Sequence, residues 1–129
     1  DYCAVKQVTI PAANLPSGWN IRDIGSIGLA GDAFSESGVF TVKASGSDIY
    51  NKADSFSYAY TALSGDGSIT ARITSMENTN EWAKCGVMIR ESLEPGSKHA
   101  SMVATPYNKV SFQCRTTSDS SATAGKPVR

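Results

Sequence analysis

The amino-acid sequence predicts an all-β domain, most simply an antiparallel sandwich of two sheets with jelly-roll topology. Short segments in which apolar and polar residues alternate are separated by clusters of Gly, Ser, Asp, Asn and Pro. No apolar stripe with a period of 3.6 residues is long enough to predict a helix. The connections are short, which favours antiparallel pairing because parallel strands need long crossovers.

Several segments have the length of strands and are rich in β-branched or aromatic residues. They are residues 39–44, 56–63, 68–76, 84–91, 99–105 and 110–117. The connections at 64–67, 94–97 and 106–109 have turn compositions, in which Pro presets φ or Gly and Asn accept positive φ. Residues 78–84 are the one segment that could form a single helical turn.

The alternation also divides each predicted strand into two faces. In the strand at 84–91 the apolar face carries Cys85, Val87 and Ile89, and we expect this face to point into the core. In the strand at 110–117 the same reasoning places Phe112 and Cys114 inward. The opposite face of the sheet is then the place to look for a ligand. It carries Arg72, Lys84, Arg90, Gln113 and Arg115.

Length and composition fit one globular domain spanning residues 1–129. The chain has 12 Lys and Arg residues against 12 Asp and Glu residues, scattered singly, so it lacks the basic stripe of a nucleic-acid-binding protein. No apolar run approaches the roughly 18 residues that would predict a membrane-spanning helix. We therefore expect no nucleic-acid partner and no membrane insertion.

The three cysteines, Cys3, Cys85 and Cys114, have no CxxC spacing, which argues against a zinc ribbon or a thioredoxin-type redox motif. At most one intrachain disulfide can form. Two alternatives stay open for Cys85 and Cys114, a disulfide within the core or two buried thiols that behave as small apolar residues.

A series of spaced motifs resembles the concanavalin A-like β-sandwich modules of large secreted bacterial polysaccharide-degrading enzymes and surface proteins. These modules are related to a "regulation of enolase" domain of unknown function. The motifs lie between residues 23 and 117 and include Gly38-x-Phe40-x-Val42, Asp48-Ile49-Tyr50, Gly65-Asp66-Gly67, Trp82-Ala83-Lys84, Gly86-Val87-Met88-Ile89-Arg90 and Gly96-Ser97-x-His99-Ala100. The resemblance implies a secreted, non-catalytic accessory module, with carbohydrate binding the usual expectation.

The chain departs from this family's pattern at its carboxyl end, because family members continue with further strands after the position of Pro127. A sandwich without its last strands would expose an unpaired edge and an open core. We expect residues 1–129 to be an incomplete N-terminal portion of a larger module, or a second polypeptide to supply the missing strands. A third arrangement closes the sheet with the N-terminal segment 5–10.

Carbohydrate modules bind sugar rings on exposed aromatic faces, flanked by side chains that hydrogen-bond to hydroxyl groups. The aromatic candidates in or near loops are Trp82, Tyr50, Tyr107 and Trp19. The predicted ligand-binding residues are Trp82, Arg90, Lys84, Arg72, Gln113, Arg115 and Tyr50. The competing interpretation is structural, since Trp82 could fill the core and Arg90 could pair with a neighbouring strand.

The sequence gives little support for an enzyme. A Cys85 nucleophile with His99 as its base would need a third group to orient the histidine, and no such group is evident. No catalytic residue and no cofactor are predicted. Asp48, Asp54 and Asp66 in acidic loops invite a structural calcium ion, although each could instead accept backbone N–H bonds in its own turn.

The sequence therefore predicts a secreted bacterial β-sandwich module that binds polysaccharide or oligosaccharide without transforming it. The alternative is a structural or assembly protein whose sandwich is completed by strands from another chain.

Overall fold

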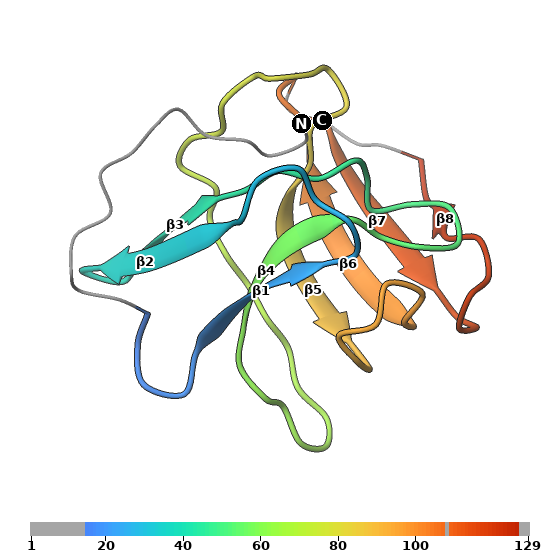
Figure 1. Ribbon diagram of the computed structural model, residues 1–129, viewed down its shortest axis with the longest axis horizontal. Coiled ribbons are helices and arrows are strands. Elements are labelled where there is room, and N and C mark those ends of the chain that lie inside the picture. The colour runs from blue at the N-terminus through green and yellow to red at the C-terminus, as the bar shows by residue number, and fades with distance from the viewer. Residues whose placement is uncertain (1–14, 108, 127–129) are drawn as a thin grey trace.

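The computed structural model describes residues 15–107 and 109–126, and these residues are all-β with antiparallel pairing throughout. The strands are β1 (Asn20–Ile24), β2 (Asp32–Glu36), β3 (Val39–Lys43), β4 (Phe56–Tyr60), β5 (Cys85–Arg90), β6 (His99–Ala104), β7 (Val110–Arg115) and β8 (Thr123–Ala124). Strands β5 to β8 form one four-stranded sheet in sequence order, while β1 pairs with β4 and β2 pairs with β3 (Figure 1). The described part of the chain contains no helix long and apolar enough to cross a membrane.

Most of the predicted strands are confirmed. Strands β3, β4, β5, β6 and β7 each lie within a segment predicted from the alternation of residues. The turn predicted at 94–97 connects β5 to β6, and the connection predicted at 106–109 joins β6 to β7. The sequence pattern missed β1, β2 and β8, which have weaker alternation.

The predicted strand at 68–76 is wrong. Residues 61–75 are exposed and form no strand, so the connection from β4 to β5 is a long loop (Figure 1). The alternation of Ile69, Ala71 and Ile73 is real, but a strand also needs a partner, and among the described residues β5 pairs only with β6. Residues 78–84 form a turn rather than a helical turn. The segment 5–10 and Cys3 lie outside the described residues.

The β1–β4 ladder packs against one face of the four-stranded sheet. The rings of Phe56, Tyr58 and Tyr60 follow one another along β4, with neighbouring centroids 5.5 Å and 5.6 Å apart, as their shared parity predicts. The Tyr58 hydroxyl donates a hydrogen bond to the carbonyl of Met88 on β5 at 3.0 Å. This face of the sheet is therefore the inner face of the molecule.

The inner face is the polar face, which reverses the prediction. Met88 and Val103 are buried there beside Lys84, His99, Ser101, Gln113 and Arg115. The apolar parity predicted to form the core points outward instead. The outer face consists of Cys85, Val87, Ile89, Ala100, Met102, Ala104, Val110, Phe112 and Cys114.

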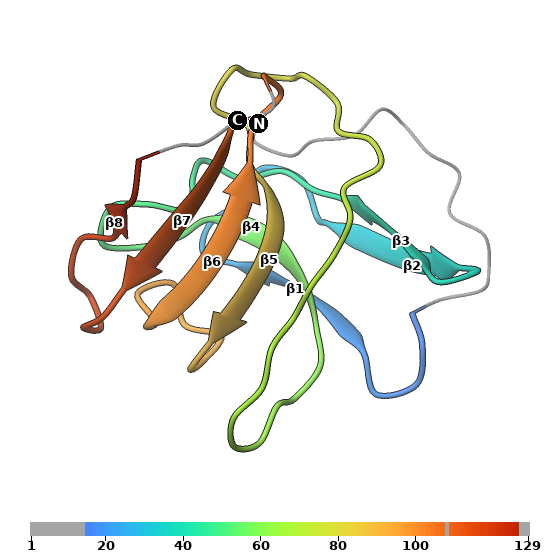
Figure 2. The same ribbon diagram turned by 180° about the vertical axis from the view of Figure 1, so that it is seen from behind.

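The physical reason for the reversal is a buried carboxylate. Among the fully buried side chains, the largest are Arg115, Ile24 and Asp54. A buried cation is tolerated where an anion and carbonyl oxygens satisfy its donors, and the loop that carries Asp54 supplies both. Alternation distinguishes the two faces of a strand, but it does not reveal that a distant loop caps the polar one. Figure 2 shows the sheet from its outer side, with β1 and β4 behind it.

Candidate functional site

Asp54 is the centre of a buried charge cluster on the inner face of the sheet. It lies two residues before β4, and its side chain is fully buried. Its carboxylate accepts hydrogen bonds from Arg90 on β5 at 2.7 Å and from both terminal nitrogens of Arg115 on β7 at 2.8 Å. One anion thus faces two cations that come from β5 and β7, the strands on either side of β6, at the same end of the sheet.

Arg115 uses all its donors within the protein. Besides the two bonds to Asp54, its guanidinium donates to backbone carbonyls on three separate loops. These bonds go to Tyr50 at 2.7 Å, Asn51 at 2.9 Å, Ser97 at 3.0 Å and Ser120 at 2.8 Å. The hydrogen bonds to Asp54 raise the pKa of Arg115 above its ordinary value, against the opposing effect of burial. Arg115 therefore ties the loops around residues 50, 97 and 120 to the end of β7.

Arg90 also directs its hydrogen-bond donors to groups within the protein. Its side chain is buried against Asp54, and its Nε donates to the carbonyl of Ser92 at 2.9 Å. A terminal nitrogen donates to the carbonyl of Glu94, and the guanidinium lies 5.3 Å from the centroid of the Phe56 ring. This geometry holds the turn after β5 closed.

His99 lies beside the cluster, at the start of β6 and opposite Arg90 in the register. Its imidazole is fully buried, its Nε2 is 3.9 Å from Asp54, and neither ring nitrogen has a hydrogen-bond partner among the described residues. Burial lowers the pKa of His99; the Asp54 carboxylate opposes this shift, and the two arginines add to it. The imidazole is therefore neutral at pH 7.

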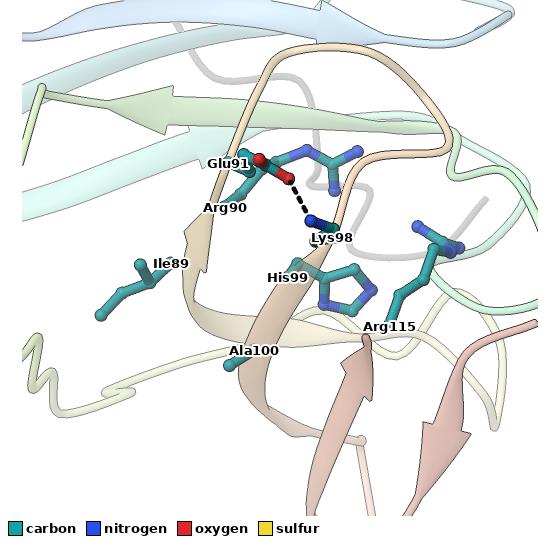
Figure 3. Close-up of a pocket in the computed structure, with 7 residues that line it drawn as sticks. All are labelled: Ile89, Arg90, Glu91, Lys98, His99, Ala100 and Arg115. Carbon is teal, nitrogen blue, oxygen red and sulfur yellow. Dashed lines mark ion pairs between the residues drawn. The ribbon is translucent and has the colours of Figure 1, made fainter. Parts of the chain in front are cut away.

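A shallow pocket of about 370 Å³ borders this cluster. Figure 3 shows its lining, with His99 between Arg115 and the β5 strand, and the exposed Glu91–Lys98 ion pair, 3.5 Å apart, at its rim. The guanidinium groups of Arg90 and Arg115 are turned toward their protein partners. The pocket consequently offers a ligand few free charged donors.

Lys84 and Tyr50 form a second polar contact on the inner face. The Lys84 side chain is buried, pairs with Asp48, and lies 5.2 Å from the centroid of the Tyr50 ring. Gln113 is also buried, and its side-chain oxygen has no partner among the described residues. Arg72 lies apart from this group, exposed on the loop at 61–75. The structure thus places Arg90, Arg115, Lys84 and Gln113 in the interior, with the half-buried Tyr50 beside Lys84.

Trp82 is the aromatic residue among the predicted site residues that is exposed, with 62% of its area accessible. Tyr107 is equally exposed, at 62%. Cys85 pairs with Ala104, so the residues that precede β5 and those that follow β6 lie at the same end of the sheet. Both views show these two connections side by side (Figures 1 and 2). Trp19, in contrast, packs against Phe40 with centroids 4.9 Å apart.

A short turn fixes the backbone at Trp82. The Trp82 N–H donates to the Asn80 side chain at 2.8 Å, and the Ala83 N–H donates to the Asn80 carbonyl at 3.0 Å. Ala83 is fully buried, so the chain on one side of the tryptophan is anchored while its indole points outward. The indole of Trp82 is therefore exposed on a backbone segment that the Asn80 turn holds in place.

The strand register and the strand order place Cys85 away from both His99 and Cys114. Cys85 lies at the opposite end of the β5–β6 pair from His99 and on the opposite face, so the two cannot act as nucleophile and base. Cys85 and Cys114 lie on strands separated by β6, beyond the reach of a disulfide with each other. The alternative of a core disulfide is wrong, and so is the expectation that these thiols point into the core.

The three aspartates that could have bound a structural calcium ion have different surroundings. Asp54 bonds to the two arginines, Asp48 pairs with Lys84 and accepts its neighbour's N–H at 2.7 Å, and Asp66 lies on the exposed loop. Within residues 15–107 and 109–126, no group of three His, Cys, Asp or Glu side chains is arranged to hold a metal ion.

A scan against protein-family models, a search of curated proteins and a search of solved structures each found no match to this chain.

Proposed function

We propose that this chain is a non-catalytic carbohydrate-binding module whose glycan lies across Trp82 and Tyr107. The observation that carries the proposal is the presence of two highly exposed aromatic rings at one end of the four-stranded sheet. Pyranose rings present an apolar side of C–H groups, which packs on an aromatic face. Two such rings at the same end of the sheet suit a chain of sugars better than a single sugar.

The surroundings of the two rings support this proposal. Glu81 immediately precedes Trp82 and Lys109 lies two residues after Tyr107; both are exposed and can hydrogen-bond to hydroxyl groups. The Asn80 turn orders the backbone at Trp82 before any ligand arrives, which lowers the entropic cost of binding.

The buried cluster supports a different role for most of the polar residues predicted from sequence. The donors of Arg90 and Arg115 are bonded to Asp54 and to carbonyls, and Lys84 is paired with Asp48. Using these groups for a sugar would require breaking buried ion pairs. We assign them to the stability of the fold, which leaves recognition to the exposed end of the sheet.

The wider setting belongs to the same proposal. The spaced motifs quoted above support a jelly-roll module of the concanavalin A-like kind, carried by a secreted bacterial protein that acts on or displays glycans. In this proposal the module holds its parent protein on a polysaccharide and leaves the chemistry to other parts of that protein.

Affinity electrophoresis in native gels that contain soluble plant, fungal or bacterial polysaccharides tests the proposal. We expect retardation by at least one polymer, and a loss of most of it in Trp82→Ala and in Tyr107→Ala. The matched control is Val39→Ala, which removes an exposed apolar side chain at the β2–β3 turn. Retardation by none of the polymers would refute glycan binding, and equal retardation of all variants would refute this location.

A second candidate function, assembly with strands from another chain, draws on one observation. Strand β5 is the end strand of its sheet among the described residues, and the loop at 61–75 beside it forms no strand. An end strand is a template for an added strand. Native mass spectrometry of the purified chain would show a stoichiometric second polypeptide if this function holds, and would show this chain alone if it does not.

A further inference from the structure

We propose that the outer face of strands β5, β6 and β7 is an interface at which a second copy of this chain docks, sheet against sheet. The proposal is independent of glycan binding, because Trp82 and Tyr107 lie at the end of the sheet and not on this face.

The composition of the outer face is the first argument. The register arranges its nine side chains in three rows across the strands. The rows are Cys85–Ala104–Val110, Val87–Met102–Phe112 and Ile89–Ala100–Cys114. Every member is apolar or a thiol, and none carries a charge. An antiparallel sheet normally turns such a face toward a core and its polar face toward water.

Exposure is the second argument. The largest side chains of the three rows are far from buried, with Ile89 exposed at 40%, Met102 at 46% and Phe112 at 49%. They lie next to one another on adjacent strands, so they form a continuous patch rather than scattered residues. Continuous apolar patches of this kind mark interaction surfaces.

The shape of the face favours a copy of itself as the partner. Along β6 the large side chain of Met102 stands between the small side chains of Ala100 and Ala104. Two such faces related by a two-fold axis and shifted by one row place each Met102 over an alanine of the other copy. Aligned sheets pack about 10 Å apart in this manner, with large residues entering the gaps beside small ones.

The rim is also self-complementary. Glu91 and Lys98 lie side by side just beyond the Ile89 row, with their charged groups 3.5 Å apart and mostly exposed. A surface that carries one acid and one base next to an uncharged patch meets no net repulsion from its own copy. A strongly acidic or basic partner would gain nothing from this face.

Sedimentation velocity over a range of concentrations, combined with thiol alkylation, tests the inference. Cys85 and Cys114 lie in two different rows of the face, so dimerisation should slow their alkylation. The decisive variant is Met102→Lys, and the matched control is Leu29→Lys, which places the same charge at a loop residue that is 67% exposed. Circular dichroism verifies that both variants fold.

We expect the wild-type chain and Leu29→Lys to form dimers with slowly alkylated thiols. Met102→Lys should weaken dimerisation by about 100-fold, because it places a charge in an apolar interface. It should also restore rapid alkylation while leaving retardation by polysaccharide unchanged.

Other results would overturn the inference. A monomer with reactive thiols would mean that the face stays open, and a monomer with protected thiols would mean that the chain covers it. A complex with a different polypeptide, or association that Met102→Lys does not weaken, would exclude a symmetric dimer through this face.

Discussion

The buried ion cluster makes a quantitative prediction about Asp54. The change Asp54→Asn keeps the size of the side chain but removes the charge that faces Arg90 and Arg115. Three charge-assisted hydrogen bonds of 2.7 Å, 2.8 Å and 2.8 Å are then weakened or lost, and two buried guanidinium groups have no anion. Breaking a buried pair in this way costs about 3–5 kcal/mol, because the remaining charge stays desolvated.

Urea denaturation followed by circular dichroism measures this loss. With a slope of about 2 kcal/mol per molar urea, a loss of about 3 kcal/mol moves the midpoint down by about 1.5 M. The control is Glu91→Gln, which breaks the exposed pair with Lys98 and should cost less than about 1 kcal/mol. If Asp54→Asn loses no more stability than Glu91→Gln, Asp54 does not hold the loops to the sheet.

Two further predictions concern stability. Gly25 has a φ of 71°, and an added Cβ would lie 2.3 Å from the Asp54 carbonyl oxygen, whereas Gly38 has a φ of 77° and open space around it. Gly38→Ala should therefore cost about 1–2 kcal/mol of conformational strain, and Gly25→Ala clearly more, in the same urea assay; equal losses would contradict the close approach. His99 is the single histidine of the chain, and its pKa is lower in the folded than in the unfolded state. The unfolded chain thus takes up a proton below about pH 6.5 that the folded chain refuses, so the free energy of unfolding should decrease from pH 7.5 to 5.5. His99→Phe should reduce that decrease, and an identical pH dependence in both proteins would show that His99 is not kept neutral.

The strand pattern was predictable because it is local. Strands β5, β6 and β7 have clear alternation and turn residues between them, and the structure pairs them as neighbours. The segment at 68–76 has the same local pattern yet forms no strand, because strand formation depends on a partner that alternation does not specify. Local pattern therefore located the sheet but not its extent.

The orientation of the sheet was not predictable from alternation. Arg90 and Arg115 are inside because Asp54, 36 and 61 residues away in sequence, satisfies them there. A hydrophobicity pattern contains no signal of such a long-range ion pair. The one available hint was that Asp54 lies just before the aromatic strand β4. In a loop, an aspartate is equally well interpreted as a turn residue or a calcium ligand.

The candidate site was partly predictable. Trp82 and Tyr107 were identified as aromatic residues near loops, and both are exposed. Their position at one end of the sheet follows from the β5–β6 register, which the sequence left undetermined. The residues predicted to surround them were chosen from the polar parity, so the reversal of the two faces moved Arg90, Lys84, Gln113 and Arg115 to the interior.

Tryptophan fluorescence tests the central claim most directly. The chain has two tryptophans, and Trp19→Phe leaves Trp82 as the sole reporter while keeping an aromatic ring against Phe40. Titration of this variant with the polysaccharide that retards the chain most strongly should shift the Trp82 emission saturably, because the sugar displaces water from the indole. The shift should be greatly reduced when Tyr107→Ala is added. Unchanged emission at concentrations that retard the protein would place the glycan elsewhere and contradict the proposed site.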